Sequence, residues 1–342
     1  MRIIVINSEG PGAVIGMQLE RAGHCVKYLD HRRRAAALQF SPLVVRSDFG
    51  DYNGYARTVE AAELFSPHDL IIVAGDAADV PKIAQVLPRA VGSSTIILSL
   101  AAGIENIDLL RGACPGACVL DGYQNLVTQL DEHGTVIHNA AGGDQIMIAS
   151  RSAVEIAAAR SVIALFDKTD LDVQAVQKVA HLHWTRMVLL VSVCGLSALM
   201  QARIVRIGAI EAGYEQLWLV LQECGAVADS AGQPVHIAEL SAFMDRLPRS
   251  VPVLVNAMLN RIDRGDLREV TALVAQMYRA ARAGCTATPG LDLIHTALAA
   301  RAAGAKDEDT IELITPSPKP APRFAASGWI SRLRAARRQS GG

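Results

Sequence analysis

The sequence contains no CxxC pair, although it has six cysteines. The two closest, Cys114 and Cys118, have Pro115 and Gly116 between them, which indicates a turn. A structural zinc site needs a second Cys or His pair at short spacing, and no second pair stands at zinc-finger spacing. We therefore expect reduced, buried thiols and no metal site.

The sequence also lacks an excess of charge of either sign, since its formal net charge is −1. Proteins that bind nucleic acid or anionic membranes by electrostatics carry a basic excess. We therefore expect no nucleic acid partner. Basic residues cluster only locally, at Arg32–Arg34 and at the C-terminal end.

Long hydrophobic segments are absent too. The longest uncharged apolar run, residues 187–201, lies between Arg186 and Arg203 and is short for a bilayer span of about 20 residues. This run predicts a buried core helix. The N-terminus leads straight into a strand pattern without the apolar region of a signal peptide. We expect a cytoplasmic protein with no transmembrane segment.

What the sequence does have is enough apolar material for a large core. Half of its 342 residues are hydrophobic and a fifth are charged, which is typical of a folded globular chain. A chain of this length suits two domains better than one.

The N-terminal part alternates between strand and helix patterns. An apolar run at 3–6, a glycine-containing turn at 7–12, a helical pattern at 14–22 and an apolar run at 25–29 form the opening βαβ unit of a doubly wound sheet. Continuous apolar runs predict parallel strands at 70–73 and 95–98, covered on both faces and separated by a helix at 80–87. Two further strands are expected at 119–120 and 135–138.

From about Ser152 the hydrophobic period becomes helical. Helices are expected at 154–166, 173–200, 207–224, 237–244 and 270–283. The fold class is therefore α/β, with a Rossmann-like doubly wound parallel sheet in an N-terminal domain and an all-α C-terminal domain. We place the first domain at 1–151 and the second at 152–305.

The last part of the chain changes in composition. Residues 316–322 form a proline-rich run, and the residues after it are basic. Such a segment cannot bury enough apolar surface to fold alone. We expect residues 306–342 to be a disordered linker and basic tail, which a weaker hypothesis treats as a contact for a partner or a membrane surface.

Several segments, in order along the chain, carry a family likeness. They are Gly12-Ala13-Val14-Ile15-Gly16, Arg21-Ala22-Gly23-His24, Ser99-Leu100-Ala101-Ala102-Gly103, His183-Trp184-Thr185-Arg186-Met187 and Gly265-Asp266-Leu267-Arg268-Glu269-Val270. In order and spacing the chain resembles the ketopantoate reductases (2-dehydropantoate 2-reductases), which make pantoate from ketopantoate with NADPH. The resemblance implies the two-domain fold above and a small-molecule ligand in an interdomain cleft.

The dinucleotide loop departs from the family pattern. The glycines of Gly-x-Gly-x-x-Gly permit the turn, the approach of the pyrophosphate and close helix–strand packing, in that order. Here these positions are Asn7, Glu9 and Gly12, with Gly10 between the last two. Asparagine tolerates the positive φ of the turn. A Glu9 carboxylate about 4 Å from a phosphate, however, costs roughly 4 kcal/mol at an effective dielectric near 20, unless the side chain turns outward to water.

Pro11 also removes one backbone N–H from the loop. At the end of the second strand, Asp30 stands where an acid bonds the ribose of NAD, and Arg32 stands where a base meets the 2′-phosphate of NADP. NAD and NADP therefore remain open as cofactors, and binding of either is in doubt. The alternative is that Asp30 caps the next helix and the arginines form a solvated face.

The catalytic positions depart as well. The resemblance implies that Arg186 replaces the catalytic lysine, and that Ala102, Leu190 and Ala257 replace two asparagines and a serine of the site. The resemblance also implies that Asp76 replaces a lysine that faces the cofactor in the ketopantoate reductases. Glu269 alone matches a family site residue outright, and His183 is a further candidate acid.

Two hypotheses follow. The first is a re-purposed family member, without the reductase activity, that keeps the cleft and binds another small molecule. The alternative is an active NAD(P)H-dependent reductase of a small 2-oxo acid such as ketopantoate, with Arg186 holding the substrate carboxylate and His183 or Glu269 assisting proton transfer. The sequence does not determine the oligomeric state, and a homodimer is one of the alternatives.

Overall fold

The computed structural model describes residues 1–59, 67–140, 143–235, 242, 244 and 253–304. The predicted opening unit is confirmed. Strand β1 (Arg2–Ile6) pairs in parallel with β2 (Cys25–Leu29), and helix α1 (Pro11–Arg21) connects them. Apolar side chains of β1 and α1 are almost fully buried, so burial on both faces explains the continuous apolar run.

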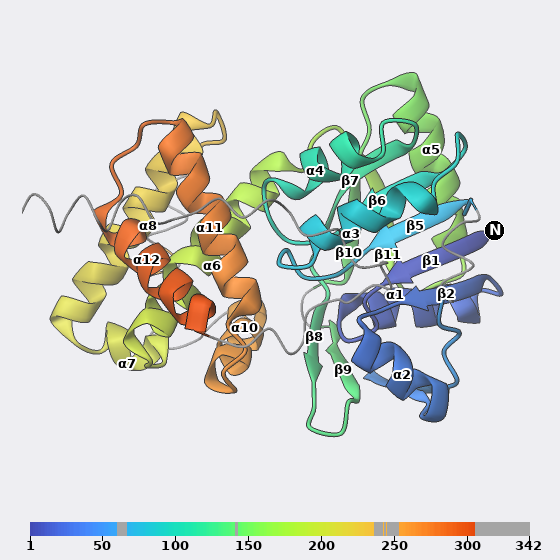
Figure 1. Cartoon of the computed structure of the whole chain (residues 1–342), viewed down its shortest axis with the longest axis horizontal. Coiled ribbons are helices and arrows are strands. Elements are labelled where there is room, and N and C mark those ends of the chain that lie inside the picture. The colour runs from blue at the N-terminus through green and yellow to red at the C-terminus, as the bar shows by residue number, and fades with distance from the viewer. Residues whose placement is uncertain (60–66, 141–142, 236–241, 243, 245–252, 305–342) are drawn as a thin grey trace, which may run out of the picture. The chain divides into compact units, whose positions relative to one another are not determined.

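The main sheet has seven strands in the order β11-β10-β7-β6-β5-β1-β2. Beyond the opening unit these are β5 (Leu70–Val73), β6 (Ile96–Ser99), β7 (Cys118–Gln124), β10 (Gln145–Ala149) and β11 (Asp172–Val176). Pairing is parallel from β2 to β7, and β10 then joins β7 antiparallel. The predicted doubly wound parallel sheet is confirmed. Helices α3 (Val80–Val86), which leads into the short η2 (Leu87–Arg89), and α4 (Asn106–Ala113) lie together on one side of it (Figure 1).

A second sheet of four strands has the order β4-β3-β9-β8. Its strands are β3 (Leu43–Ser47), β4 (Tyr52–Gly54), β8 (Val127–Leu130) and β9 (Val136–Asn139), and helix α2 (Arg32–Phe40) precedes it. The strand expected at 135–138 therefore exists, but it pairs in this second sheet. Local pattern identifies a strand, whereas the partner it pairs with depends on the tertiary structure.

The prediction of one helix over 173–200 is wrong at its N-terminal end. Residues 172–176 form β11, which pairs in parallel with β10 at the edge of the main sheet, and helix α6 begins only at Ala180 and ends at Met200. Pairing with β10 outweighs the local helical pattern. Helix α5 (Ala153–Ile163), followed by the short η4 (Ala164–Phe166), packs against β7 and β11. Residues beyond 151 thus contribute to the sheet of the first domain.

The remaining residues form a helical domain around α6. Helices α8 (Glu211–Ser230), α10 (Val253–Asp263), α11 (Arg268–Ala283) and α12 (Pro289–Gly304) all pack against α6, as Figure 1 shows, and α7 (Ile204–Gly208) precedes α8. Helix α6 is long and apolar enough to cross a membrane, but most of it is buried by its neighbours. The expected core helix is confirmed, and the cytoplasmic location stays a prediction.

Two expectations fall largely on residues outside the described ranges. These are the helix at 237–244, of which only Ala242 and Met244 are described, and the tail at 306–342. All six cysteines are free, and Cys25 and Cys285 are exposed, so the expectation of buried thiols is wrong for these two. Among the described residues, no group of three or more His, Cys, Asp or Glu side chains is placed to hold a metal ion.

Candidate functional site

A cavity of about 680 Å³ brings the predicted cofactor loop together with two of the predicted catalytic residues, Arg186 and Glu269. The loop after β1 contributes Asn7, Glu9 and Gly10, α6 contributes Arg186, and α11 contributes Glu269. The loops after β5 and β6, the β8–β9 hairpin and α10 complete the lining. A volume of this size suits a small-molecule site.

The loop makes its turn as its residue types require. Asn7 has a φ of 77°, in the left-handed region that asparagine tolerates better than most residues. A Cβ added at Gly12 would lie 2.0 Å from the backbone oxygen of Asn7. Gly12 therefore keeps the role of the packing glycine, which lets α1 start close to β1.

The backbone amides of this loop are mostly engaged within the protein. The amide of Ser8 donates to Asp30 Oδ1 at 2.9 Å, and the amide of Glu9 donates to Asn7 Oδ1 at 2.7 Å. Pro11 has no amide hydrogen. Of the four loop positions from 8 to 11, only Gly10 has an amide that donates to no acceptor within the described residues.

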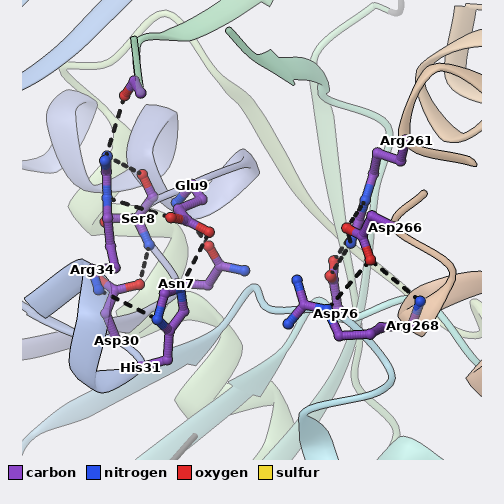
Figure 2. A network of polar contacts seen from close by, with 11 residues as sticks. Asn7, Ser8, Glu9, Asp30, His31, Arg34, Asp76, Arg261, Asp266 and Arg268 are labelled. Atoms are coloured by element: carbon purple, nitrogen blue, oxygen red, sulfur yellow. Dashed lines mark hydrogen bonds and ion pairs between the residues drawn. The ribbon is translucent and has the colours of Figure 1, made fainter. Parts of the chain in front are cut away.

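Glu9 has two basic neighbours (Figure 2). Its carboxylate lies 3.4 Å from His31 Nε2 and 3.9 Å from Arg34 Nε. Burial by itself raises the pKa of Glu9, but the hydrogen bond with His31 and the charges of His31 and Arg34 outweigh it, so this pKa lies below its ordinary value. The same hydrogen bond raises the pKa of His31. Glu9 is therefore a carboxylate held by the protein's own cations.

Asp30 and Arg34 hold the loop after β1 in place through hydrogen bonds to Ser8. Asp30 is buried, and burial raises the pKa of its carboxyl group. Arg34 donates from Nε to Ser8 Oγ at 3.1 Å and from Nη2 to the Ser8 carbonyl at 3.4 Å. The alternative that Asp30 caps the next helix is wrong, because His31 caps α2 by accepting from the amide of Arg34. Arg32 is the first residue of α2, and its side chain is outside the described part of the structure.

An ion-pair network that the sequence did not predict lines part of the cavity, and Figure 2 shows its contacts. Arg261 of α10 donates from Nη1 to Asp76 Oδ1 at 3.0 Å and from Nη2 to Asp76 Oδ2 at 2.6 Å. Arg261 also binds Asp266, and Asp266 pairs with Arg268 at 3.3 Å. Asp76 and Arg261 are 185 positions apart in sequence, so no local pattern could reveal the pair.

Glu269 lies beside this network and is 4% exposed. Its carboxyl group accepts a hydrogen bond from the amide of Ala78 at 3.3 Å. Burial, and next the negative charge of Asp76, raise the pKa of Glu269 well above its ordinary value. Glu269 is therefore a carboxylic acid that holds its proton beyond the usual range for glutamate, in a cavity that a ligand can reach.

This raised pKa predicts a pH-dependent stability. Folded Glu269 holds its proton more tightly than the unfolded chain does, so its contribution is fully present below the ordinary glutamate pKa and is lost as the pH rises toward the raised pKa. The expected loss in the free energy of unfolding is about 1.4 kcal/mol per pH unit within that window. Urea unfolding at several pH values measures it. The Glu269→Gln variant should lack this fall, and parallel pH profiles of the two proteins would contradict the assignment.

Arg186 is a buried cation without a carboxylate partner. It is 5% exposed, its guanidinium carbon lies 4.0 Å from the centroid of the Tyr123 ring, and its Nη2 donates to the Gln124 carbonyl. Its Nε is buried with no hydrogen-bond partner, and no carboxylate in the described part of the chain lies within ion-pair distance of it. A buried charge without a counter-ion costs several kcal/mol.

His183 lies apart from this cavity. It lines a separate cavity of about 70 Å³ with Ser99 and Asp121, and its Nε2 lies 3.2 Å from Asp121 Oδ1. The ring of Tyr123 contacts both His183 and Arg186. The role of His183 as an acid stays a prediction, and its position gives that role no direct access to the large cavity.

Comparison with known proteins agrees with the fold. The family model "Ketopantoate reductase PanE/ApbA" matches residues 4–152, and "Ketopantoate reductase PanE/ApbA C terminal" matches residues 178–302. The chain belongs to the PanE/ApbA ketopantoate reductase family. This is a family of ketopantoate-reductase-like oxidoreductases, and the resemblance found in the sequence is confirmed.

The individual proteins to which this chain is similar share little sequence identity with it. "Uncharacterized oxidoreductase YkpB" of Bacillus subtilis (strain 168) is 22% identical over 299 residues, which cover 87% of this chain and 98% of that protein. A PanE/ApbA family ketopantoate reductase from Ralstonia eutropha JMP134 superimposes with a TM-score of 0.74 at 22% identity, over 88% of this chain and 98% of that one. D-mandelate dehydrogenase, solved with NADH and anilino(oxo)acetate, gives a TM-score of 0.75 at 17% identity, over the same shares. At these identities the solved structures show the PanE/ApbA fold alone.

Proposed function

We propose that this PanE/ApbA family member does not reduce ketopantoate with NADPH and that its cavity binds another small molecule. The observation that carries this proposal is the state of the loop after β1. Its amides at Ser8 and Glu9 donate to side chains of the protein, and Pro11 has none to offer. A dinucleotide pyrophosphate binds at such a helix N-terminus through free amides, so the loop is poorly equipped to bind it.

The charge of the loop supports the same conclusion. Glu9 is ionised, because His31 and Arg34 lower its pKa, and it lines the cavity where the pyrophosphate would lie. Its neighbours offset part of the repulsion, but they are held by Glu9 and Ser8 rather than free for a phosphate. NAD and NADP are equally affected, since both carry the pyrophosphate. Asp30 is a poor partner for a ribose, because it is buried and its Oδ1 already accepts from the amide of Ser8.

The chemical step of the reductase is also poorly supported. Arg186 stands where the resemblance implies a catalytic lysine, and a guanidinium is a poor proton donor because it stays charged in proteins. Ala102, Leu190 and Ala257, in place of polar site residues, line the same cavity as Arg186. They offer no hydrogen bonds to a keto or hydroxyl group.

The second candidate is an active NAD(P)H-dependent reductase of a small 2-oxo acid. A specific observation favours it, namely that Arg186 and Glu269 line one cavity with the loop. In that case Arg186 would hold the substrate carboxylate, and protonated Glu269 would donate a proton to the carbonyl oxygen.

A titration separates the two candidates. Purified protein is titrated with NADPH and with NADH, following nucleotide fluorescence and heat, and is then assayed for NADPH oxidation with ketopantoate. We expect no binding in the low micromolar range and no oxidation above the rate without protein. An active ketopantoate reductase under the same conditions is the control. Tight binding of either nucleotide would overturn the first candidate and support the second.

A further inference from the structure

We propose that Ser47, His138 and Asp144 form a reactive site outside the cavity, in which Ser47 is a nucleophile that takes an acyl group from small activated esters. Ser47 is the last residue of β3, His138 lies in β9, and Asp144 comes directly before β10. None of the three lines the large cavity or the small cavity beside His183. This activity is therefore independent of the proposed function.

The three side chains form one chain of hydrogen bonds. The parallel pairing of β3 with β9 places Ser47 opposite His138, and Ser47 Oγ lies 2.8 Å from His138 Nδ1. The other ring nitrogen, Nε2, lies 2.9 Å from Asp144 Oδ1. A serine and an aspartate thus occupy opposite nitrogens of one imidazole, as in the triad of serine hydrolases. The two nitrogens are exchanged relative to the serine proteases, and either nitrogen of a neutral ring can accept a proton.

The hydrogen bonds assign the tautomer of His138. A carboxylate only accepts hydrogen bonds, so Nε2 carries the hydrogen that is donated to Asp144. Nδ1 of the neutral ring is then an acceptor. Ser47 Oγ accepts from the amide of Phe49 at 3.1 Å, and its own hydrogen is left to donate to Nδ1. His138 is therefore placed to take the proton of Ser47.

Burial isolates the two groups that move and hold the proton. The side chain of His138 is fully buried and that of Asp144 is 7% exposed, and the ring of Phe49 lies 5.0 Å from that of His138. An imidazolium formed there is stabilised by the Asp144 carboxylate instead of water. Asp144 also has a φ of 46°, a strained conformation of the kind found at functional sites. Ser47 itself is half-buried and reaches the surface.

The reaction balances between the site, the ester and water. Ser47 Oγ forms a bond to the carbonyl carbon of the ester while its proton passes to His138 Nδ1. The bond from that carbon to the alcohol oxygen then breaks, and His138 gives the proton to the departing alcohol. Water attacks the acyl-serine in the same two steps, which releases the acid and restores Ser47.

The position of Ser47 favours esters with a good leaving group. Ser47 lies between two exposed residues, Arg46 and Asp48, at the end of a strand. A substrate bound on such an open surface gains little from burial, so the rate depends mainly on how easily the ester bond breaks. Small aryl esters meet this condition, because a phenolate leaves more readily than an alkoxide.

The test uses the full chain and a fluorophosphonate probe, which labels activated serines irreversibly. Ser47 Oγ displaces fluoride from phosphorus, and His138 takes the proton. Intact-protein and peptide mass spectrometry measure the rate and the position of labelling. We expect a single label per chain, at Ser47, and hydrolysis of p-nitrophenyl acetate that labelling removes. Absence of the label from Ser47 in the wild-type protein would overturn the proposal.

Variants of the two catalytic residues assign their roles. Ser47→Ala should lose the label, and His138→Gln should slow labelling at least about a hundredfold, because it removes the general base. Ser161→Ala is the matched control and should be labelled as the wild type is. Ser161 is more exposed than Ser47, but its hydroxyl donates to the carbonyl of Ala157 rather than to a histidine. Labelling at Ser161 in place of Ser47 would show that exposure alone governs the reaction.

Asp144 is a positioning residue, because it acts through His138. Asp144→Asn keeps the size of the side chain, and labelling should slow at least about a hundredfold because the imidazolium loses its carboxylate. Asp144→Glu restores the charge and should recover part of the rate. If the three side chains only hold β3, β9 and the residues before β10 together, these variants would lower the melting temperature while the wild type takes no label. That result would refute the reactive site.

Discussion

Replacing Asn7 and Glu9 together by glycine is expected to tighten the binding of NADPH and NADH by roughly two orders of magnitude. A charge about 4 Å from a phosphate costs roughly 4 kcal/mol at an effective dielectric near 20, and His31 and Arg34 offset part of this in the wild type. Removing the Glu9 carboxylate leaves those two cations without their acid. Removing the Asn7 side chain frees the amide of residue 9, and glycine adopts the positive φ of position 7 without strain.

Calorimetric or fluorescence titration of wild type and double variant with both nucleotides measures the gain. Glu132→Gly is the matched control, since Glu132 also lines the cavity but its side chain is 87% exposed and lies on the β8–β9 turn. Pro11 and Asp76 remain in the double variant, so the affinity should stay below that of a family member with an intact loop. An unchanged affinity in the double variant would show that Glu9 does not govern this site.

Replacing Arg261 by leucine is expected to lower the free energy of unfolding by about 2 to 3 kcal/mol, somewhat less than the loss of one partner of a fully buried pair. Arg261 binds Asp76 through two nitrogens and also binds Asp266, and its side chain is only 25% exposed. Removing one partner of a largely buried pair leaves the remaining carboxylates uncompensated, which costs more than the pair itself contributes. The pKa of Asp266, which burial would raise but the charge of Arg261 holds below its ordinary value, should rise in the variant.

Urea unfolding of the wild type and the Arg261→Leu variant near neutral pH measures this loss. Arg279→Leu is the control, because Arg279 also makes two hydrogen bonds to one carboxylate, that of Glu105, but is 56% exposed. An exposed pair contributes at most about 1 kcal/mol. The double change Arg261→Leu with Asp76→Asn should recover part of the stability lost in the single variant. Equal losses for Arg261→Leu and Arg279→Leu would contradict the assigned role of burial.

The sequence alone determined the elements whose signal is local. The βαβ unit at 3–29 can be predicted from the sequence for two reasons. Strands that are buried on both faces need continuous apolar runs, and a glycine is needed at position 12, where α1 approaches Asn7. The sequence also predicts α6 as a core helix, because its apolar run is longer than a typical strand and shorter than a typical membrane span. The same local reading fails at 172–176, where pairing with β10 decides the structure.

The tertiary structure alone decided the state of the candidate site. The sequence placed Glu9, Arg186 and Glu269 at the site, but the charge on each depends on neighbours that are distant along the chain. His31 and Arg34 hold Glu9 ionised, burial beside Asp76 raises the pKa of Glu269, and Arg186 has no carboxylate partner among the described residues. Electrostatic energies vary with separation and burial in three dimensions, and the order of residues along a chain specifies neither.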